Sequence, residues 1–175
     1  CITDMVDNSP YFWATTLDSN GYRQVTTNTL DVSLGGIIQF YMRYGADDPD
    51  PGCETADLPE EGVRLQYSIN NGATWVDINY WIPTDILTDP LYSWTQYTEN
   101  IPVAAQTANT LFRWFQQDNS GSQYDNWGLD NVLVSSNTNA NYLWDFGDGN
   151  TSTLATPCHS YATEGNYNVT LTVNS

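Results

Sequence analysis

The chain has 175 residues, of which 21 are acidic and four are basic, so its formal net charge is −17 at neutral pH. A surface with this excess of carboxylates repels nucleic acid and anionic membranes, and neither is expected as a partner. Lysine is absent, whereas Thr, Asn, Tyr, Val and Ile are abundant. This composition favours strands and turns over helices, and we expect an all-β protein.

Short segments with alternating apolar residues follow one another between residues 22 and 135. In one of them Ile38, Phe40 and Met42 fall on the same face of an extended strand, which predicts one buried and one wetted face. Asn-Asn-Gly at residues 70–72 predicts a hairpin turn, because Asn and Gly tolerate positive φ. The pattern indicates a jelly-roll β-sandwich, with strands at 22–27, 37–44, 63–69, 74–81, 93–101, 110–117 and 129–135.

Residues 47–61 form an acidic segment that contains three prolines at 49, 51 and 59. A calcium loop would have to fold several of these carboxylates around one ion, and the prolines stiffen the chain against such a turn. We therefore favour a solvated loop over a calcium loop here.

The three cysteines are an odd set, so one disulfide plus one free or intermolecular thiol fits them. Neither a CxxC pair nor a Cys/His cluster is present, which argues against zinc. Because the chain begins at Cys1 and opens with no signal peptide, we expect it to be a piece of a longer protein. No apolar run is long enough to cross a membrane.

A second unit is predicted to begin after a short polar linker, giving domains at residues 1–136 and 137–175. Tyr167, Val169, Leu171 and Val173 alternate with polar residues near the end of the chain. This alternation predicts a half-buried strand at residues 167–173.

Residues 22–134 resemble the reelin-repeat family. The resemblance rests on the order of the segments YRQVTTNTLDVSLGGIIQFYMRYG, EGVRLQYSINNGATW and FRWFQQDNSGSQYDNWGLDNV, with a cysteine-containing loop between the first two. Within it, SINNGATW also resembles the Asp-box hairpin, with Asn70 in place of the Asp. That likeness implies a folding role for Ser68, Gly72 and Trp75.

The resemblance to reelin repeats implies a jelly-roll sandwich with a structural calcium ion near the chain ends. In such modules an acid on the last strand meets acids near the first strand. Asp130 is therefore the first candidate ligand, and Asp4, Asp7 and Asp18 are further candidates. The alternative for Asp130 is an ion pair with a strand arginine, for which Arg23, Arg43 and Arg113 are available.

Residues 144–149, WDFGDG, with Pro157, His159 and Tyr161 behind them, resemble a polycystic-kidney-disease (PKD) domain. The resemblance implies an immunoglobulin-like β-sandwich, but the second unit is too short for a whole one. Intervening residues of a longer parent are missing, or the jelly roll completes the small sheet, or a neighbouring chain donates strands. We favour the first explanation.

Catalysis is not expected, because the only histidine, His159, lies in the PKD-like motif, where it should pack against Tyr161. We predict a non-catalytic adhesion or structural module of a large bacterial surface or secreted protein, stabilised by calcium. Its expected partners are neighbouring domains of the same polypeptide or copies of itself. The alternative is a carbohydrate-binding module appended to a secreted hydrolase, with Trp13, Trp81, Trp94 and Tyr92 as candidate sugar-stacking rings.

Overall fold

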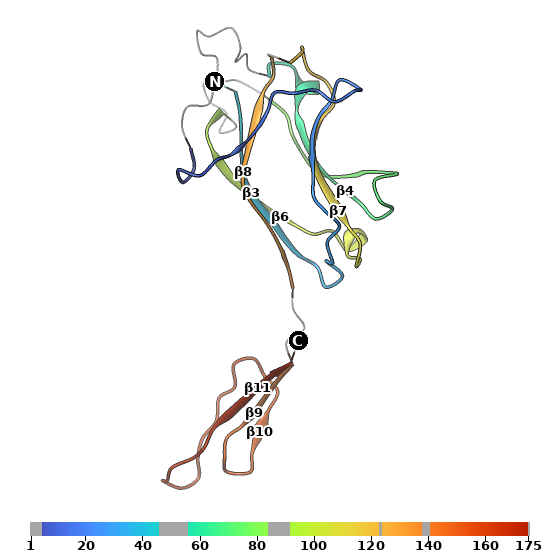
Figure 1. Cartoon of the computed structure of the whole chain (residues 1–175). Coiled ribbons are helices and arrows are strands. Elements are labelled where there is room, and N and C mark those ends of the chain that lie inside the picture. Colours follow the sequence, from blue (N-terminus) through green and yellow to red (C-terminus); the bar gives the residue numbers. More distant parts are fainter. Residues whose placement is uncertain (1–4, 46–55, 84–91, 123, 138–140, 175) are drawn as a thin grey trace. The chain divides into compact units, whose positions relative to one another are not determined.

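A computed structural model describes residues 5–45, 56–83, 92–122, 124–137 and 141–174 of the chain (Figure 1). The chain divides into two units, residues 1–137 and residues 138–175. The described residues form antiparallel strands joined by loops and two single-turn 3₁₀ segments, Pro59–Glu61 and Val103–Ala105, which confirms the all-β prediction. Within these residues no helix has the length and apolar character that crossing a membrane requires.

Unit 1 contains two sheets of four antiparallel strands each (Figure 1). The first sheet has the order β1-β8-β3-β6, with β1 Phe12–Ala14, β8 Trp127–Ser136, β3 Gly36–Tyr44 and β6 Thr95–Asn100. The second has the order β2-β7-β4-β5, with β2 Arg23–Thr26, β7 Leu111–Gln116, β4 Val63–Ser68 and β5 Val76–Trp81. Each predicted strand before residue 136 is present. β1 was missed, because three residues are too few to show alternation.

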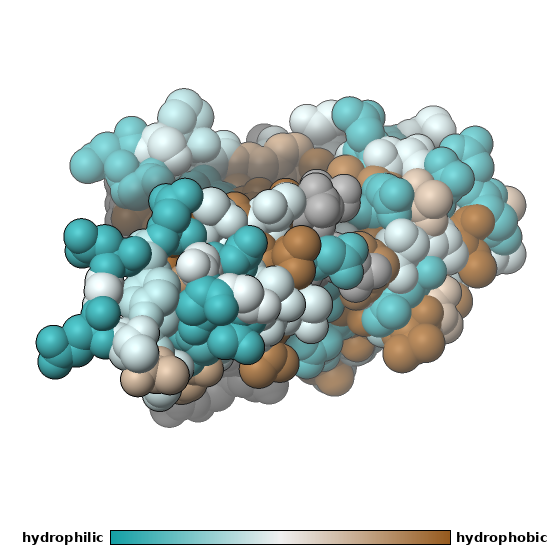
Figure 2. Space-filling view, turned by 90° about the horizontal axis from the view of Figure 1, so that it is seen from below, coloured by the Kyte–Doolittle hydropathy of each residue, from teal (hydrophilic) through white to brown (hydrophobic). Residues whose placement is uncertain are grey.

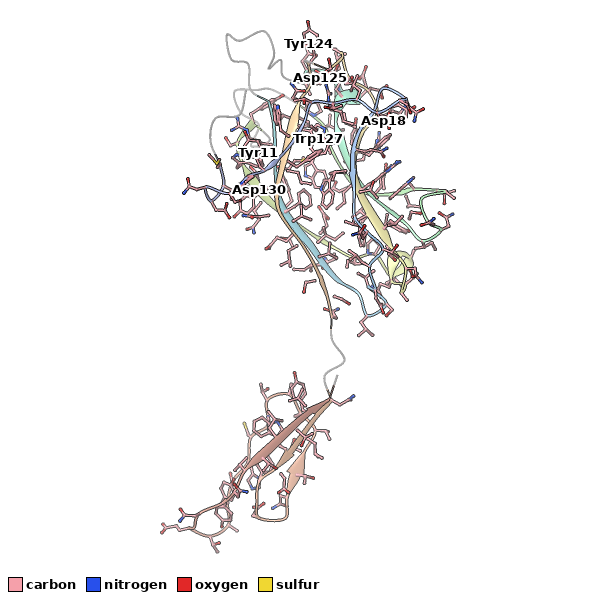
Figure 3. The ribbon with its side chains drawn as sticks, viewed as in Figure 1. Tyr11, Asp18, Tyr124, Asp125, Trp127 and Asp130 are labelled. Atoms are coloured by element: carbon pink, nitrogen blue, oxygen red, sulfur yellow. The ribbon has the colours of Figure 1, made fainter. Side chains whose placement is uncertain are left out.

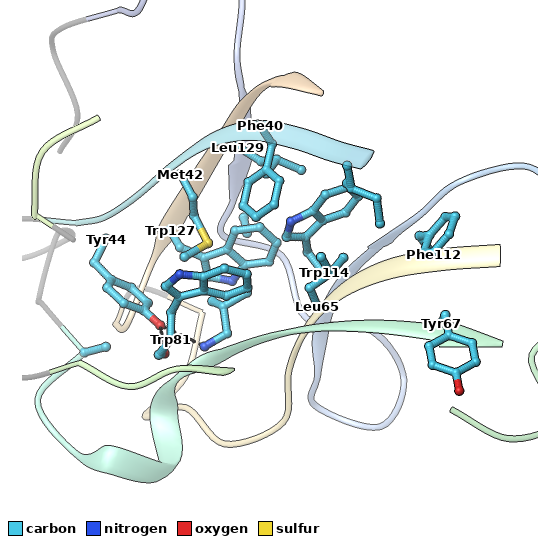
Figure 4. Close-up of a cluster of buried hydrophobic side chains, with 14 of the residues drawn as sticks. Phe40, Met42, Tyr44, Leu65, Tyr67, Trp81, Phe112, Trp114, Trp127 and Leu129 are labelled. Atoms are coloured by element: carbon cyan, nitrogen blue, oxygen red, sulfur yellow. Dashed lines mark hydrogen bonds between the residues drawn. The ribbon is translucent and has the colours of Figure 1, made fainter. Parts of the chain in front are cut away.

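The inner faces of the two sheets meet in an aromatic core (Figure 4). Ile38, Phe40 and Met42 of β3 are completely buried, as their alternation predicts. The ring of Phe40 lies edge-on to Trp114 of β7 and Trp81 of β5, with centroids 5.1 and 5.4 Å apart. Edge-to-face contacts of this kind add to the stabilisation that comes from burial alone. The face in Figure 2, by contrast, mixes hydrophilic residues with small groups of hydrophobic ones.

The predicted hairpin joins β4 to β5. The Ser68 hydroxyl accepts a hydrogen bond from the Gly72 amide at 2.9 Å, and the Asn70 side-chain oxygen accepts one from the Thr74 amide at 3.0 Å. Asn71 and Gly72 have positive φ, at 56° and 83°. These contacts confirm the hairpin and the folding role of Ser68 and Gly72. They also explain why Asn70 can replace the Asp of an Asp-box, since the oxygen of its side-chain amide accepts a hydrogen bond as a carboxylate oxygen would.

Trp75, the third residue with an expected folding role, is half-buried and lies outside the core. It stands two residues before Asp77, which pairs with Gln66 on the outer face of the sheet. The alternation of a strand therefore directs Trp75 outward as well. There its ring packs on the guanidinium of Arg113, 4.2 Å from the ring centroid.

Unit 2 is one three-stranded antiparallel sheet in the order β10-β9-β11. Its strands are β9 Asn141–Asp145, β10 Thr151–Ser152 and β11 Thr170–Asn174, so the last strand begins later than predicted. Leu171 pairs with Trp144 and Val173 with Tyr142, which places all four side chains on one face. Leu171 and Val173 remain 45% and 51% exposed, so residues 141–174 leave this part of the face largely uncovered.

The WDFGDG turn of unit 2 is anchored by the chain's single histidine. The His159 ring stacks on Phe146 with centroids 4.0 Å apart and meets Tyr161 edge-on at 4.7 Å, as predicted. Its Nε2 lies 2.8 Å from a carboxylate oxygen of Asp148. Gly147 has a φ of 75°, and a Cβ there would lie 2.7 Å from the Asn168 carbonyl oxygen, so this turn requires glycine.

Truncation of Phe40 should test the aromatic core. We expect Phe40→Ala to lower the free energy of unfolding by about 3–5 kcal/mol, because it leaves a cavity between the two sheets. The matched control is Val103→Ala at a side chain that is 83% exposed, which should cost less than about 0.5 kcal/mol. Urea denaturation monitored by Trp fluorescence measures both. Equal losses in the two variants would contradict the placement of Phe40.

Candidate metal centre

Asp130 lies where the pairing of β8 with β3 is interrupted by a β-bulge. Tyr41 pairs with Asp130 and Gln39 with Leu133, so two residues of β8 stand opposite one residue of β3. Asn131, inside the bulge, has a φ of 49°. A bulge of this kind bends its strand and redirects a side chain. Here it shifts the alternation of β8, and the core side resumes at Val134, which pairs with Ile38.

The Asp130 carboxylate is buried and only partly satisfied. The residue is 6% exposed. Its Oδ1 accepts a hydrogen bond from the Asn131 amide at 2.8 Å, whereas its Oδ2 is buried without a hydrogen-bond partner. Burying a carboxylate oxygen without a partner is costly, so such an atom calls for an explanation. Among the described residues no ion pair joins Asp130 to an arginine, so this part of the structure gives the ion-pair alternative no support.

The N-terminal segment brings a second carboxylate to this place. Asp7 Oδ2 accepts a hydrogen bond from the Asn131 side-chain amide at 3.0 Å, so Asn131 connects the two acids. Hydrogen bonds from Ser9 and then from Asn131 hold the pKa of Asp7 below its ordinary value. Tyr11, on the same segment, packs edge-on against Trp94, with ring centroids 5.3 Å apart.

The other two candidate ligands differ in position. Asp4 lies outside the described residues. Asp18 stands apart from Asp130 in Figure 3, where it closes the turn before β2. Its Oδ1 accepts the amides of Asn20 and Tyr22 at 2.8 and 3.0 Å, and its Oδ2 accepts the Gln24 side-chain amide at 3.0 Å. The structure thus brings Asp7 to Asn131, the residue that follows Asp130, and leaves Asp18 elsewhere.

The donor set at Asp130 fits a hard cation better than a soft one. Asp130 Oδ2 is an uncommitted carboxylate oxygen, and Asp7 is a second carboxylate near it. Calcium takes six to eight oxygen ligands, including carbonyls and waters. The described residues contain no group of three or more acids, histidines or cysteines placed to hold a metal. Further ligands would therefore be carbonyls, waters or residues outside the described ranges.

A second buried polar cluster was not foreseen from the sequence, although Arg23 was placed in a strand. Arg23 is completely buried. Its guanidinium donates to Gln116 Oε1 at 2.8 Å and to the carbonyls of Gly121, Tyr124 and Asp125 at 2.5, 2.7 and 3.3 Å. Its position two residues before Val25, on the inward face of β2, was the available signal. The arginine holds the loop before β8 against the end of the sandwich.

Two carboxylates belong to this Arg23 cluster. Glu61 is 3% exposed and accepts the amides of Asp57 and Leu58 at 3.0 and 2.9 Å, whereas residues 57–60 of the acidic segment are exposed. The rest of that segment, residues 47–55, lies outside the described residues. Asp125 is 1% exposed and accepts the amide of Ser120. Burial, with the nearby charge of Glu61, raises the pKa of Asp125 to about 6 against the lowering effect of Ser120 and Arg23.

The aromatic residues expected to stack on sugars do not form a common platform. Trp81 and Tyr92 are each 8% exposed and belong to the core. Trp94 is half-buried against Tyr11, and Trp13 is half-buried on β1. Among the cysteines, Cys158 is free and exposed, while Cys1 and Cys53 lie outside the described residues.

Comparison with known proteins separates the same two parts of the chain. The reelin subrepeat B family matches residues 9–135, and the PKD domain family matches residues 131–175. Short stretches are similar to a microbial collagenase of Vibrio alginolyticus (61% identity over 31 residues), the pre-pro-metalloprotease PrtV of Vibrio cholerae (66% over 32) and collagenase ColA of Bacillus cereus (62% over 32). Each stretch covers 18% of this chain and no more than 4% of the relative.

Asp125 makes stability depend on pH in a definite direction. Its folded-state pKa of about 6 exceeds the ordinary 3.8, so its charge destabilises the fold above about pH 6, and this cost disappears as the pH falls towards 3.8. Asp125→Asn should therefore raise the free energy of unfolding near pH 7.5 by on the order of 2 kcal/mol, and much less near pH 4. Urea denaturation at both pH values measures this.

The control is Asp118→Asn, which removes the same charge from an exposed position of the same loop. It should shift stability slightly and almost equally at both pH values, because an exposed charge interacts weakly. If Asp118→Asn matched Asp125→Asn at both pH values, general charge repulsion would explain the effect and the buried carboxylate would not.

Proposed function

Because the chain belongs to the reelin subrepeat B family and carries a PKD domain behind that module, we propose that it is a non-catalytic structural or adhesion module of a larger secreted or surface protein of bacteria. We propose further that calcium stabilises its first unit. The unpartnered, buried Oδ2 of Asp130 is the observation on which the calcium proposal depends. A structural role for the metal follows from its place, where the N-terminal segment meets β8.

The position of the single histidine supports a non-catalytic role. His159 is stacked on Phe146 and hydrogen-bonded to Asp148, both within the PKD turn. The described part of the chain therefore offers no histidine base to activate a Ser, Thr or Cys nucleophile. Both matched families are domain modules that occur within longer polypeptides.

The secreted context comes from the relatives. The collagenases and the metalloprotease share short, highly similar stretches with this chain, but the chain spans no more than 4% of their length. We take from them a bacterial, extracellular setting and no enzymatic activity. The acidic surface suits such a setting, since a large net charge keeps a protein soluble.

Neighbouring domains of the same polypeptide or further copies of it are the proposed partners. Unit 2 supports this, because residues 141–174 leave Leu171 and Val173 about half exposed on the sheet face that also carries Tyr142 and Trp144. An apolar sheet face of this kind is stable when another element covers it.

In the first unit, Asp130 Oδ2 and Asp7 would hold the cation. A bound calcium ion would neutralise the two carboxylates and fasten the N-terminal segment to β8. Asn131 already aligns the two acids by donating to Asp7 and to Asp130 through its side chain and its main chain. Binding to the folded state alone raises stability by mass action.

Calcium should raise the melting temperature of the chain, and a chelator should lower it. At a free calcium concentration of about 100 times Kd the gain is about 2.7 kcal/mol. Asp130→Asn should abolish the calcium-dependent shift, whereas Asp18→Asn, a matched carboxylate away from the centre, should retain it. Differential scanning calorimetry with calcium or EDTA measures the shift. Identical curves with calcium and chelator would rule out the site.

A non-catalytic module should not hydrolyse protein substrates. The purified chain should leave gelatin and casein intact, both with and without added calcium or zinc, while a bacterial collagenase run in parallel degrades gelatin. Release of peptides by the chain itself would overturn the proposal, provided that the activity co-purifies with the chain through a second column.

A further inference from the structure

An unbroken series of hydrogen-bonded side chains crosses the outer face of the sheet β2-β7-β4-β5. The donor–acceptor distances along this series lie between 2.6 and 3.0 Å. We call it the outer polar ladder, and it consists of Arg64, Asp77, Gln66, Arg113, Gln24 and Asp18.

Aromatic rings are interleaved with the ladder. The Arg64 guanidinium lies 3.8 Å from the centroid of Tyr80. The Arg113 guanidinium lies over two rings, 4.2 Å from Trp75 and 4.0 Å from Phe115. The register explains this arrangement, since Phe115, Arg64 and Tyr80 stand opposite one another on adjacent strands. Stacking on rings fixes the planes of both guanidinium groups.

This face is accessible to a ligand. The side chains of Arg64 and Asp77 are 34% and 43% exposed. Gln24 is exposed, and Trp75 and Tyr80 are half-buried. Arg113 donates through Nε and Nη1 and Arg64 through Nη1, so each guanidinium keeps further N–H donors for a ligand.

The side chains of the ladder are held in place by their own hydrogen bonds without a ligand. Each of its members already has at least one hydrogen-bond partner in the ladder, which restricts its rotamers and reduces the entropy lost on binding. Four strands spaced about 4.8 Å apart make this face roughly 15 Å wide, which is enough for more than one sugar ring. Donors and acceptors alternate along it, and partly exposed aromatic rings stand between them.

The charges of the face indicate which ligand it suits. Arg64 is neutralised by Asp77, and Arg113 lies near Asp77 and Asp18. The net charge of −17 disfavours the approach of an anionic chain. Hydroxyl groups both donate and accept hydrogen bonds, and the C–H faces of sugar rings pack on aromatic rings. We propose that the outer face of this sheet binds an uncharged polysaccharide.

This proposal goes beyond the structural role and does not depend on the calcium centre, which lies on the other sheet. It replaces the sugar-stacking residues expected from the sequence with Trp75 and Tyr80. Those two rings differ from Trp81 and Tyr92 because they lie on the solvent side of the sheet and not in the core.

Affinity electrophoresis of the full chain tests the proposal. Native gels would contain soluble xylan, hydroxyethyl cellulose, mixed-linkage β-glucan, galactomannan or glycogen, with polygalacturonate and heparin as anionic probes. We expect retardation by at least one neutral polysaccharide and by neither anionic probe. Trp75→Ala and Asp77→Asn should each weaken that binding about tenfold or more, the equivalent of about 1.4 kcal/mol.

Tyr124→Ala is the matched control, because Tyr124 is 40% exposed on a loop away from the ladder. It should bind as the unaltered chain does. Trp75 also packs beside the hairpin turn, so melting temperatures are compared, and Asp77→Asn serves as the variant that keeps the hairpin intact. Failure of every neutral polysaccharide, retardation by the anionic probes alone, or full binding by both ladder variants would overturn the proposal. Retention on gelatin without binding to any polysaccharide would assign the face to a protein partner and overturn it too.

Discussion

Strand β8 contributes to two different environments, and the bulge at Asn131 is what allows this. Before the bulge, Trp127 and Leu129 face the core while the carboxylate of Asp130 is buried with an oxygen left unpartnered. After it, Val132 and Leu133 are exposed, 42% and 51%. Without the extra residue the strand would keep one pattern along its whole length. The position of Asp130, and therefore the candidate metal centre, depends on this irregularity.

The buried charges of unit 1 are satisfied in different ways. The two Nη groups of Arg23 donate to backbone carbonyl oxygens and to the side-chain oxygen of Gln116, whereas its buried Nε has no hydrogen-bond partner. For Asp125, the hydrogen bonds from Ser120 and the charge of Arg23 do not offset the cost of burying the carboxylate, and its pKa is therefore raised. Asp130 keeps one oxygen with no partner at all. Arg23 Nε and Asp130 Oδ2 are both unpartnered, but only Asp130 Oδ2 is an anionic oxygen that a cation could bind.

The two faces of the second sheet show how one alternating pattern builds a core on one side and a polar surface on the other. Leu65 and Trp114 point into the core, while their neighbours Arg64, Gln66 and Arg113 point outward. The outward residues are long and amphipathic, and their stems and guanidinium planes cover aromatic rings that would otherwise be fully wetted. Such a face is stable by itself and still offers polar groups to a partner. The sheet of unit 2 differs, because its exposed side chains include the apolar residues Leu171 and Val173.

The sequence by itself determined the strands, the hairpin at residues 70–72 and the core face of β3, because each depends on alternation or turn chemistry within a few residues. It also singled out Asp130, as a lone carboxylate within an apolar strand. Only the tertiary structure placed Asp7 beside Asn131 and Asp18 elsewhere, turned Trp75 outward and buried Trp81. Those outcomes depend on which strands become neighbours and on a bulge that shifts the register. Contacts between residues far apart in the chain, such as Arg23 with Gln116, depend on how the strands pack, and no local sequence pattern predicts them.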